Sequence, residues 1–122
     1  MIGYVTVGTN DLPRAAKYYD ELLGTIGAKR AMEMDRLVMW GVSPTAPAFA
    51  IIKPFDGKPA TPANGGTIAF AMDSKEKVDA FYAKAIELGG TDEGPPGNRG
   101  PTFYAGYFRD LDGNKCNAFF MG

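Results

Sequence analysis

Apolar residues recur with a helical period in two stretches of the chain, each preceded by a short run of strand-forming residues. In the first stretch the spacing is i, i+3, i+4, i+7, i+10 and i+11, which forms one buried stripe: Leu12, Ala15, Ala16, Tyr19, Leu22 and Leu23. Asp11 or Asn10 is expected to cap this helix, and Gly24 to end it. Residues 2–7 predict the preceding strand.

The second helical stretch repeats this arrangement. Residues 67–72 predict a strand, and Asp73 is expected to cap the helix, with Glu76 completing a capping box. The apolar stripe that follows consists of Val78, Phe81, Tyr82 and Ala85. Two consecutive glycines, Gly89 and Gly90, are expected to stop the helix.

Short strand candidates follow each helix. In the first half they are residues 29–34, 37–42 and 48–53, and in the second half residues 90–93, 102–109 and 115–121. Residues 94–101 are rich in glycine and proline and predict a loop. Residues 110–114 contain Asp-Gly and Gly-Asn steps, which favour a hairpin turn between the last two strands.

The two halves match at a constant offset of 63 residues, seen in the pairs Gly3 and Gly66, Tyr18 and Phe81, and Gly27 and Gly90. The pattern is therefore βαβββ, repeated twice, which predicts the α+β class. We expect a single domain built of two modules, residues 1–54 and 64–122, joined by a Pro/Gly-rich segment. The uncovered faces of two curled mixed sheets are expected to leave a cleft between them.

Composition narrows the classes of partner. The formal net charge is −1 and no basic block occurs, which argues against nucleic-acid binding, and no apolar run is long enough to predict a membrane span. Cys116 is the only cysteine, so an internal disulfide is impossible, and a cytoplasmic protein is the default expectation. The chain contains no histidine, which removes the commonest metal ligand and general base.

Several segments resemble a known family. The paired βαβββ units, the Thr9–Leu12 start of the first helix, Tyr19 within it and the 108–114 segment (Phe-Arg-Asp-Leu-Asp-Gly-Asn) are similar to the glyoxalase / bleomycin resistance / extradiol dioxygenase superfamily, which has the vicinal oxygen chelate fold. The resemblance covers essentially the whole chain. Its most specific part, the turn at 110–114, marks the fold and carries no catalytic chemistry.

The resemblance implies where a metal would be held. Metal-using relatives place one ligand early on the first strand of each half and another, commonly glutamate, on the last strand. The matching residues here are Tyr4, Thr67 and Asn117, with either Ala50 or Ile52 as the fourth. Neutral oxygen and methyl groups are poor ligands for zinc and similar ions, so we expect no metal and no cofactor.

Alternation along the strands predicts an aromatic, weakly polar cleft in place of a metal site. The expected lining residues are Tyr4, Thr6, Trp40, Thr67, Phe103, Tyr107 and Asn117, with Met39 an equal alternative to Trp40. By resemblance, a tyrosine matching Tyr107 contacts the ligand in fosfomycin-type resistance enzymes. The competing interpretation is that these rings simply fill the core.

Three functions remain open from the sequence. The first is a metal-free protein that binds a small organic molecule, as bleomycin-resistance-type relatives do, and those relatives imply a homodimer. The second is a glyoxalase-like lyase or dioxygenase that acts without metal or with an atypical metal site, so whether the protein is an enzyme is left open. The third is a degenerate copy kept as a structural or interaction module.

Overall fold

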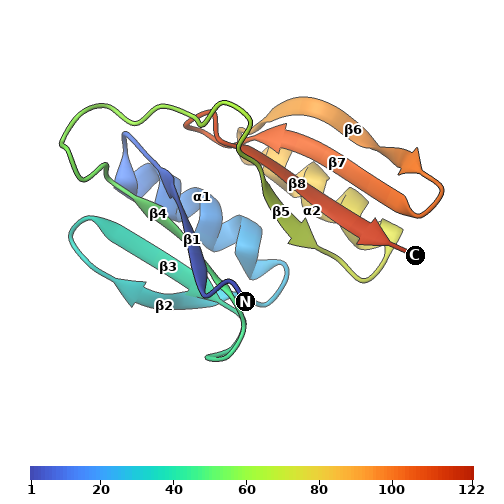
Figure 1. The fold of residues 1–122 in the computed structure, drawn as a ribbon, viewed down its shortest axis with the longest axis horizontal. Helices are drawn as coiled ribbons and strands as arrows, with labels where there is room; N and C mark the ends of the chain where they lie inside the picture. The colour runs from blue at the N-terminus through green and yellow to red at the C-terminus, as the bar shows by residue number, and fades with distance from the viewer. The chain divides into compact units, whose positions relative to one another are not determined.

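The computed structural model describes all residues from Met1 to Gly122, and the chain divides into two compact units. The N-terminal unit is Met1–Pro62 and the C-terminal unit is Ala63–Gly122, so the boundary falls inside the predicted Pro/Gly-rich joint. Each unit contains one four-stranded mixed sheet and one helix in the order βαβββ (Figure 1). The predicted α+β class and the repeated module are confirmed.

In the N-terminal unit, β1 (Tyr4–Gly8) leads into α1 (Leu12–Gly24), and three strands follow. These strands are β2 (Lys29–Glu33), β3 (Leu37–Gly41) and β4 (Ala48–Ile52). The sheet has the order β1-β4-β3-β2, in which β1 is parallel to β4 and the other neighbours are antiparallel. Helix α1 therefore carries the chain from one edge of the sheet to the other.

The C-terminal unit repeats this topology. Its elements are β5 (Ile68–Ala71), α2 (Lys75–Glu87), β6 (Thr91–Gly100), β7 (Phe103–Arg109) and β8 (Lys115–Met121). The sheet order is β5-β8-β7-β6, again with one parallel pair, β5 and β8. Helices α1 and α2 each have 13 residues and begin at positions 12 and 75, which reproduces the offset of 63 residues expected from the sequence.

The helix caps agree with the sequence in one unit and differ in the other. At α1, the Asp11 side chain accepts a hydrogen bond of 3.1 Å from the Arg14 N–H, as predicted. At α2 the cap is Ser74, which accepts from the Lys77 N–H at 3.1 Å, so the assignment of the cap to Asp73 is wrong. Asp73 lies one residue too early and instead forms an ion pair of 2.9 Å with the Lys77 ammonium.

The prediction of a loop over residues 94–101 is also wrong, because β6 covers nearly all of it. Strand β6 lies at the edge of the sheet and pairs only with β7, and an edge strand tolerates prolines, which have no N–H to donate. The pairing shifts register between Gly94 and Gly97, which leaves Pro95 and Pro96 outside the paired positions. Glycine and proline here mark an irregular edge strand.

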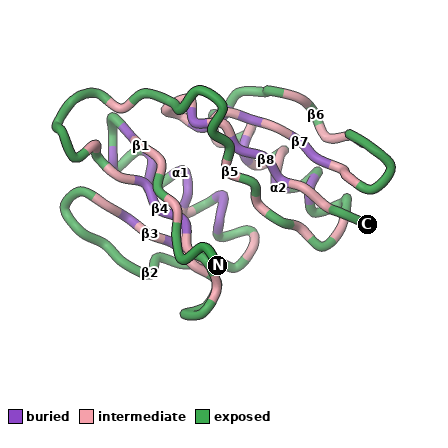
Figure 2. The backbone as a smooth tube through the Cα atoms, in the orientation of Figure 1, coloured by how far each residue is buried: buried purple, intermediate pink, exposed green.

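Each helix packs on one face of its own sheet, and no helix of the same unit covers the opposite face (Figures 1 and 2). In the N-terminal unit the ring of Tyr19 lies 4.7 Å from that of Phe49. In the C-terminal unit the Phe81 ring lies 5.3 Å from Phe70 and 6.2 Å from Phe108. The two cores therefore lie between helix and sheet, as the apolar stripes predict. Neither helix has the length and apolar character needed to cross a membrane.

Candidate functional site

The uncovered face of the C-terminal sheet carries Asn117 near its centre. Asn117 lies on β8, opposite Ala69 of β5 and Tyr107 of β7, whereas Cys116 and Ala118 alternate to the helix-covered face and are fully buried. Asn117 is only 5% exposed, and its Oδ1 atom has no hydrogen-bond partner. Because a buried acceptor without a donor costs about 1–3 kcal/mol, the fold retains an unfavourable polar atom at this position.

Two cationic side chains flank the aromatic ring next to Asn117. The guanidinium carbon of Arg99 lies 5.6 Å from the centre of the Tyr107 ring, and the ammonium of Lys115 lies 5.3 Å from it. Arg99 is held in place because its Nη2 donates a hydrogen bond of 2.7 Å to the Pro95 carbonyl oxygen. Neither cation forms an ion pair. This part of the face therefore combines an aromatic ring with uncompensated positive charge.

Aromatic rings extend along the same face. Phe103 and Phe119 stack with ring centres 5.6 Å apart and an interplanar angle of 21°, and both are half-buried. Ala105, opposite Phe119, is fully buried. Thr67 is exposed and comes just before β5, two residues before Ala69. Three of the predicted lining residues, Phe103, Tyr107 and Asn117, thus share one face, and Thr67 lies at its margin.

In the N-terminal unit, Tyr4 and Thr6 lie on the uncovered face of their own sheet. They pair with Ala48 and Ala50 of β4, and both are exposed, Tyr4 by 60%. The alternate position Val5 pairs with Phe49, whose ring contacts α1 through Tyr19. Tyr4 and Thr6 are therefore accessible on the side away from α1.

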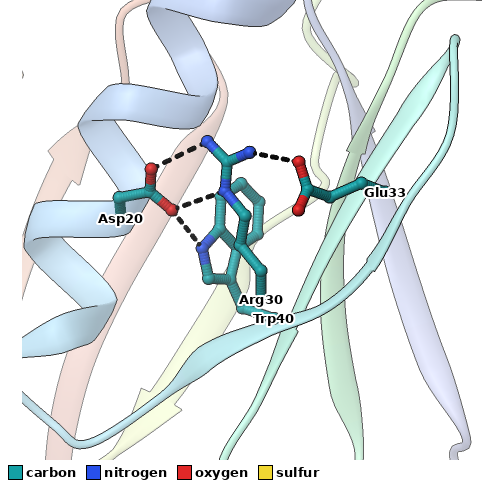
Figure 3. A network of polar contacts seen from close by, with 4 residues as sticks. All are labelled: Asp20, Arg30, Glu33 and Trp40. Carbon is teal, nitrogen blue, oxygen red and sulfur yellow. Dashed lines mark hydrogen bonds and ion pairs between the residues drawn. The ribbon is translucent and has the colours of Figure 1, made fainter.

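Trp40 points the other way, so its expected place among the lining residues is corrected. Its ring is 1% exposed and lies 5.8 Å from the Tyr19 ring, on the helix-covered face. Its indole Nε1 donates a hydrogen bond of 2.9 Å to Asp20 of α1 (Figure 3). Met39, the alternative by alternation, pairs with Ala50 and takes the uncovered face. Trp40 is thus a core residue of the N-terminal unit.

Asp20 connects Trp40 to a surface ion pair (Figure 3). Its carboxylate accepts two further hydrogen bonds from Arg30, of 2.9 and 2.8 Å, and Arg30 also binds Glu33 at 2.7 Å. The Arg30 hydrogen bonds, helped by Trp40 and opposed by partial burial, hold the pKa of Asp20 below its ordinary value of 3.8. The folded chain therefore favours the charged carboxylate more than the unfolded chain does.

This shift predicts a pH dependence of stability. Because the folded pKa is lowered, the stabilising contribution of Asp20 is present above the unfolded pKa and is lost as pH falls through the folded one. The difference in unfolding free energy between wild type and Asp20→Asn is expected to be largest near pH 7, at less than about 1 kcal/mol for this partly exposed pair, and to vanish in acid. Urea unfolding from pH 7 to pH 2 measures it. When Arg30→Gln is present in both proteins, the difference in unfolding free energy at pH 7 should become smaller, because Arg30 is the main cause of the lowered pKa of Asp20. A difference that does not change with pH would contradict this role of Asp20.

The sequence did not predict the contacts of two arginines near the site. Arg99 was missed because its segment predicts a loop, and the register shifts of β6 break the alternation that would have placed its side chain. Arg109 braces the 110–114 turn by donating to the Gly113 carbonyl oxygen at 3.0 Å, and its ion-pair partner is Glu93 at 3.0 Å.

Comparison with known proteins identifies the family of this chain. The sequence matches the family model described as the Glyoxalase/Bleomycin resistance protein/Dioxygenase superfamily over residues 1–117. The chain belongs to this superfamily. The crystal structure of a glyoxalase/bleomycin resistance protein from Albidiferax ferrireducens T118 is 45% identical, with a TM-score of 0.89, and the match covers 98% of this chain and 97% of that one.

More distant members of the superfamily share the fold. A lactoylglutathione lyase from Agrobacterium tumefaciens is 20% identical, with a TM-score of 0.73 and coverage of 98% of this chain and 92% of that one. A glyoxalase/bleomycin resistance protein/dioxygenase family enzyme from Burkholderia phytofirmans PsJN is 16% identical, with a TM-score of 0.76 and coverage of 96% and 95%. No match was found among curated proteins.

The strand register decides which residue of the first half corresponds to Asn117 within the superfamily's repeat. Asn117 lies opposite Ala69, and the position 63 residues before Ala69 is Thr6, which lies opposite Ala50. Ala50 is therefore the counterpart of Asn117, and Ile52 is not.

The side chains at the four positions where the resemblance leads one to expect metal ligands do not fit a divalent metal ion. They offer a phenol, a hydroxyl, a methyl group and an amide, from Tyr4, Thr67, Ala50 and Asn117. Metals of this class bind imidazole, thiolate or carboxylate, and none of these groups occurs among the four side chains. Within the chain, no group of three or more His, Cys, Asp or Glu side chains is arranged to hold a metal ion.

Proposed function

We propose that the protein binds a small organic molecule on the uncovered face of the C-terminal sheet, around Asn117, with no divalent metal ion at the superfamily's usual ligand positions. The observation that carries the proposal is the buried Oδ1 atom of Asn117, which has no donor within the chain. Because the atom is buried, a ligand would reach it by displacing the side chains that cover it. A ligand that then donates a hydrogen bond to this atom would recover the energy that the free protein loses there. Binding sites commonly retain such destabilising groups because they serve the ligand.

The surroundings of Asn117 favour an aromatic ligand with an acidic group. Phe103, Phe119 and Tyr107 offer ring surfaces, and rings in such sites hold planar ligands by burial and stacking. Arg99 and Lys115 add positive charge beside Tyr107 without an acidic partner. A hydroxylated aromatic carboxylate combines the donor, the ring and the negative charge, so 4-hydroxybenzoate is a suitable first probe. In the N-terminal unit, taken by itself, Tyr4 and Thr6 are exposed on the uncovered face of their own sheet and are proposed as ligand contacts there.

The substitution Asn117→Leu tests the proposal because binding and stability are expected to change in opposite directions. Removal of the unpaired acceptor should raise the free energy of unfolding by about 1 kcal/mol. The same change should weaken 4-hydroxybenzoate binding at least about tenfold, roughly 1.4 kcal/mol. Titration of the full chain, followed through the side-chain amide signals of Asn117 in wild type and the Tyr107 signals in both, measures binding. Urea unfolding measures stability.

A matched variant separates this effect from a general one. Asn98 lies on the edge strand β6 and is exposed, so Asn98→Leu should leave both quantities nearly unchanged. The proposal fails if Asn117→Leu destabilises the protein and leaves probe binding as in wild type, because Asn117 would then be a structural residue. It also fails if elemental analysis of untagged protein, purified without chelator, finds stoichiometric zinc, nickel, iron or manganese.

We further propose a homodimer in the cytoplasm. Most of the exposed large apolar side chains belong to the N-terminal unit, among them Ile2, Tyr4, Met32 and Met34, and exposed apolar surface often marks interfaces. A monomer mass by light scattering would contradict the dimer. The single cysteine, Cys116, is buried and cannot form an internal disulfide, which suits a reducing compartment.

A further inference from the structure

A pocket in the N-terminal unit lies apart from the uncovered face of the C-terminal sheet. It has a volume of about 460 Å³, which is in the usual range for small-molecule sites. The residues that matter for its chemistry come from the end of β1, the β2–β3 turn and the segment after β4: Thr9, Asn10, Arg36, Lys53, Phe55 and Lys58. The proposed function uses none of these residues.

Positive charge gathers around this pocket without compensation. Arg36, Lys53 and Lys58 all line it, and none of them forms an ion pair. Asp35 and Asp56 are close in sequence, but neither lines the pocket, and Asp56 uses Oδ1 to accept from the Lys58 N–H at 2.9 Å. Three cations without an ion-pair partner line one pocket of a protein whose net charge is −1, which favours an anionic ligand there.

The guanidinium of Arg36 is oriented by its neighbours. Its Nη2 donates a hydrogen bond of 3.3 Å to the Lys53 carbonyl oxygen, and its backbone carbonyl accepts from the Lys53 N–H at 2.8 Å. Its guanidinium carbon also lies 5.3 Å from the centre of the Phe55 ring. A guanidinium held against an aromatic ring is a common arrangement for binding carboxylate or phosphate through two hydrogen bonds.

Hydrogen bonds to backbone groups hold the segment after β4 in place. The Asn10 side chain accepts from the Ala60 N–H at 2.7 Å and donates to the Ala60 carbonyl oxygen at 3.1 Å. Gly57 takes a φ of +74° and donates to the Pro54 carbonyl oxygen at 3.1 Å, which closes a tight turn. The segment that carries the cations is thus fixed at both ends, and little ordering remains to oppose binding.

Phe55 gives the pocket an apolar side. Its side chain is 90% exposed, which is unusual for phenylalanine and leaves ring surface available next to Arg36. We propose that this pocket binds a small aromatic anion, an aryl phosphate or aryl carboxylate, whose acidic group contacts Arg36 and Lys53 while its ring stacks on Phe55. The anionic group supplies negative charge that balances the three cations, and the ring covers the exposed phenylalanine.

The test uses the full chain, with phenyl phosphate, benzoate, inorganic phosphate and neutral benzyl alcohol as probes. Amide signals of residues 36, 53 and 55–58 are expected to shift saturably with phenyl phosphate and with benzoate. The probe that binds more tightly decides between the phosphate and carboxylate forms. The double variant Arg36→Gln/Lys53→Gln should weaken binding at least about tenfold, roughly 1.4 kcal/mol. Lys17→Gln makes a single charge change on an exposed face of α1 and should alter binding by less than about twofold.

Phe55→Ala separates the ring from the charge. It leaves all three cations in place, so it should remove the preference for phenyl phosphate over inorganic phosphate while leaving phosphate binding itself. The proposal is overturned if no anionic probe gives saturable shifts in the millimolar range, if benzyl alcohol binds as tightly as the anions, or if the double variant binds like wild type. Failure of binding at Asn117 would leave these signals unaffected, so the two proposals are tested separately.

Discussion

Replacing Trp40 by alanine is expected to lower the free energy of unfolding by about 3–5 kcal/mol, the usual loss for a large aromatic residue removed from a core. Trp40 is 1% exposed and packs against Tyr19 of α1 and Phe49 of β4. The change also removes the indole N–H donor to Asp20. Urea unfolding followed by circular dichroism measures the loss, since the variant has no tryptophan to report by fluorescence.

Two further variants decide which face of β3 is the core. Met39→Ala, the next residue along the strand, changes the uncovered face and should cost about 1 kcal/mol or less, because Met39 is only half-buried. Trp40→Phe keeps an aromatic ring and should fall between the two, since it loses the hydrogen bond to Asp20 and some packing. Equal losses for Met39→Ala and Trp40→Ala would mean that Trp40 is not the core residue of this strand.

The order of elements was predictable because the repeats and turns leave local signals. The apolar stripe of α1 follows a helical period, and the aspartates and glycine of the 110–114 turn favour the positive φ of +86° that Gly113 adopts. Cross-strand alternation then placed Tyr107 and Asn117 on one face correctly. These signals are short-range, so the sequence alone carries them.

The sequence-based predictions failed where the local pattern fits two arrangements equally well. Strand β3 reads Leu-Val-Met-Trp-Gly, in which neighbouring residues are equally apolar, so alternation could not decide between Met39 and Trp40. The deciding contact is with Asp20, a residue 20 positions away on α1. The basic pocket was missed for a similar reason, because Arg36 and Lys53 are brought together by the pairing of β3 with β4 and share no local motif. The unpaired state of Asn117 Oδ1 likewise depends on its three-dimensional neighbours.

Asp110→Ala is expected to lower the free energy of unfolding by about 2–4 kcal/mol, which is the second of the two large effects on stability. The Asp110 Oδ1 atom accepts hydrogen bonds from the backbone N–H groups of Asp112 and Asn114, both at 2.9 Å, and Oδ2 accepts from the Asn114 side-chain amide at 3.0 Å. Asp110 and Asn114 are 6% and 7% exposed. In the variant the N–H groups that now donate to Asp110 would therefore be left without an acceptor where little water can reach them. Hydrogen bonds to a charged group contribute about 1.5–3 kcal/mol each, and bonds to one residue do not add fully.

The effect should reach the candidate site, because this turn joins β7 to β8, the strands that carry Tyr107 and Asn117. Amide hydrogen exchange in both strands is expected to accelerate along with the loss of stability. Asp56→Ala is the matched control, since the Asp56 carboxylate is exposed and accepts only from the Lys58 N–H, and it should cost no more than about 0.5 kcal/mol. If the two alanine variants were equally stable, the turn would not be what fixes the pairing of β7 with β8, the strand that carries Asn117.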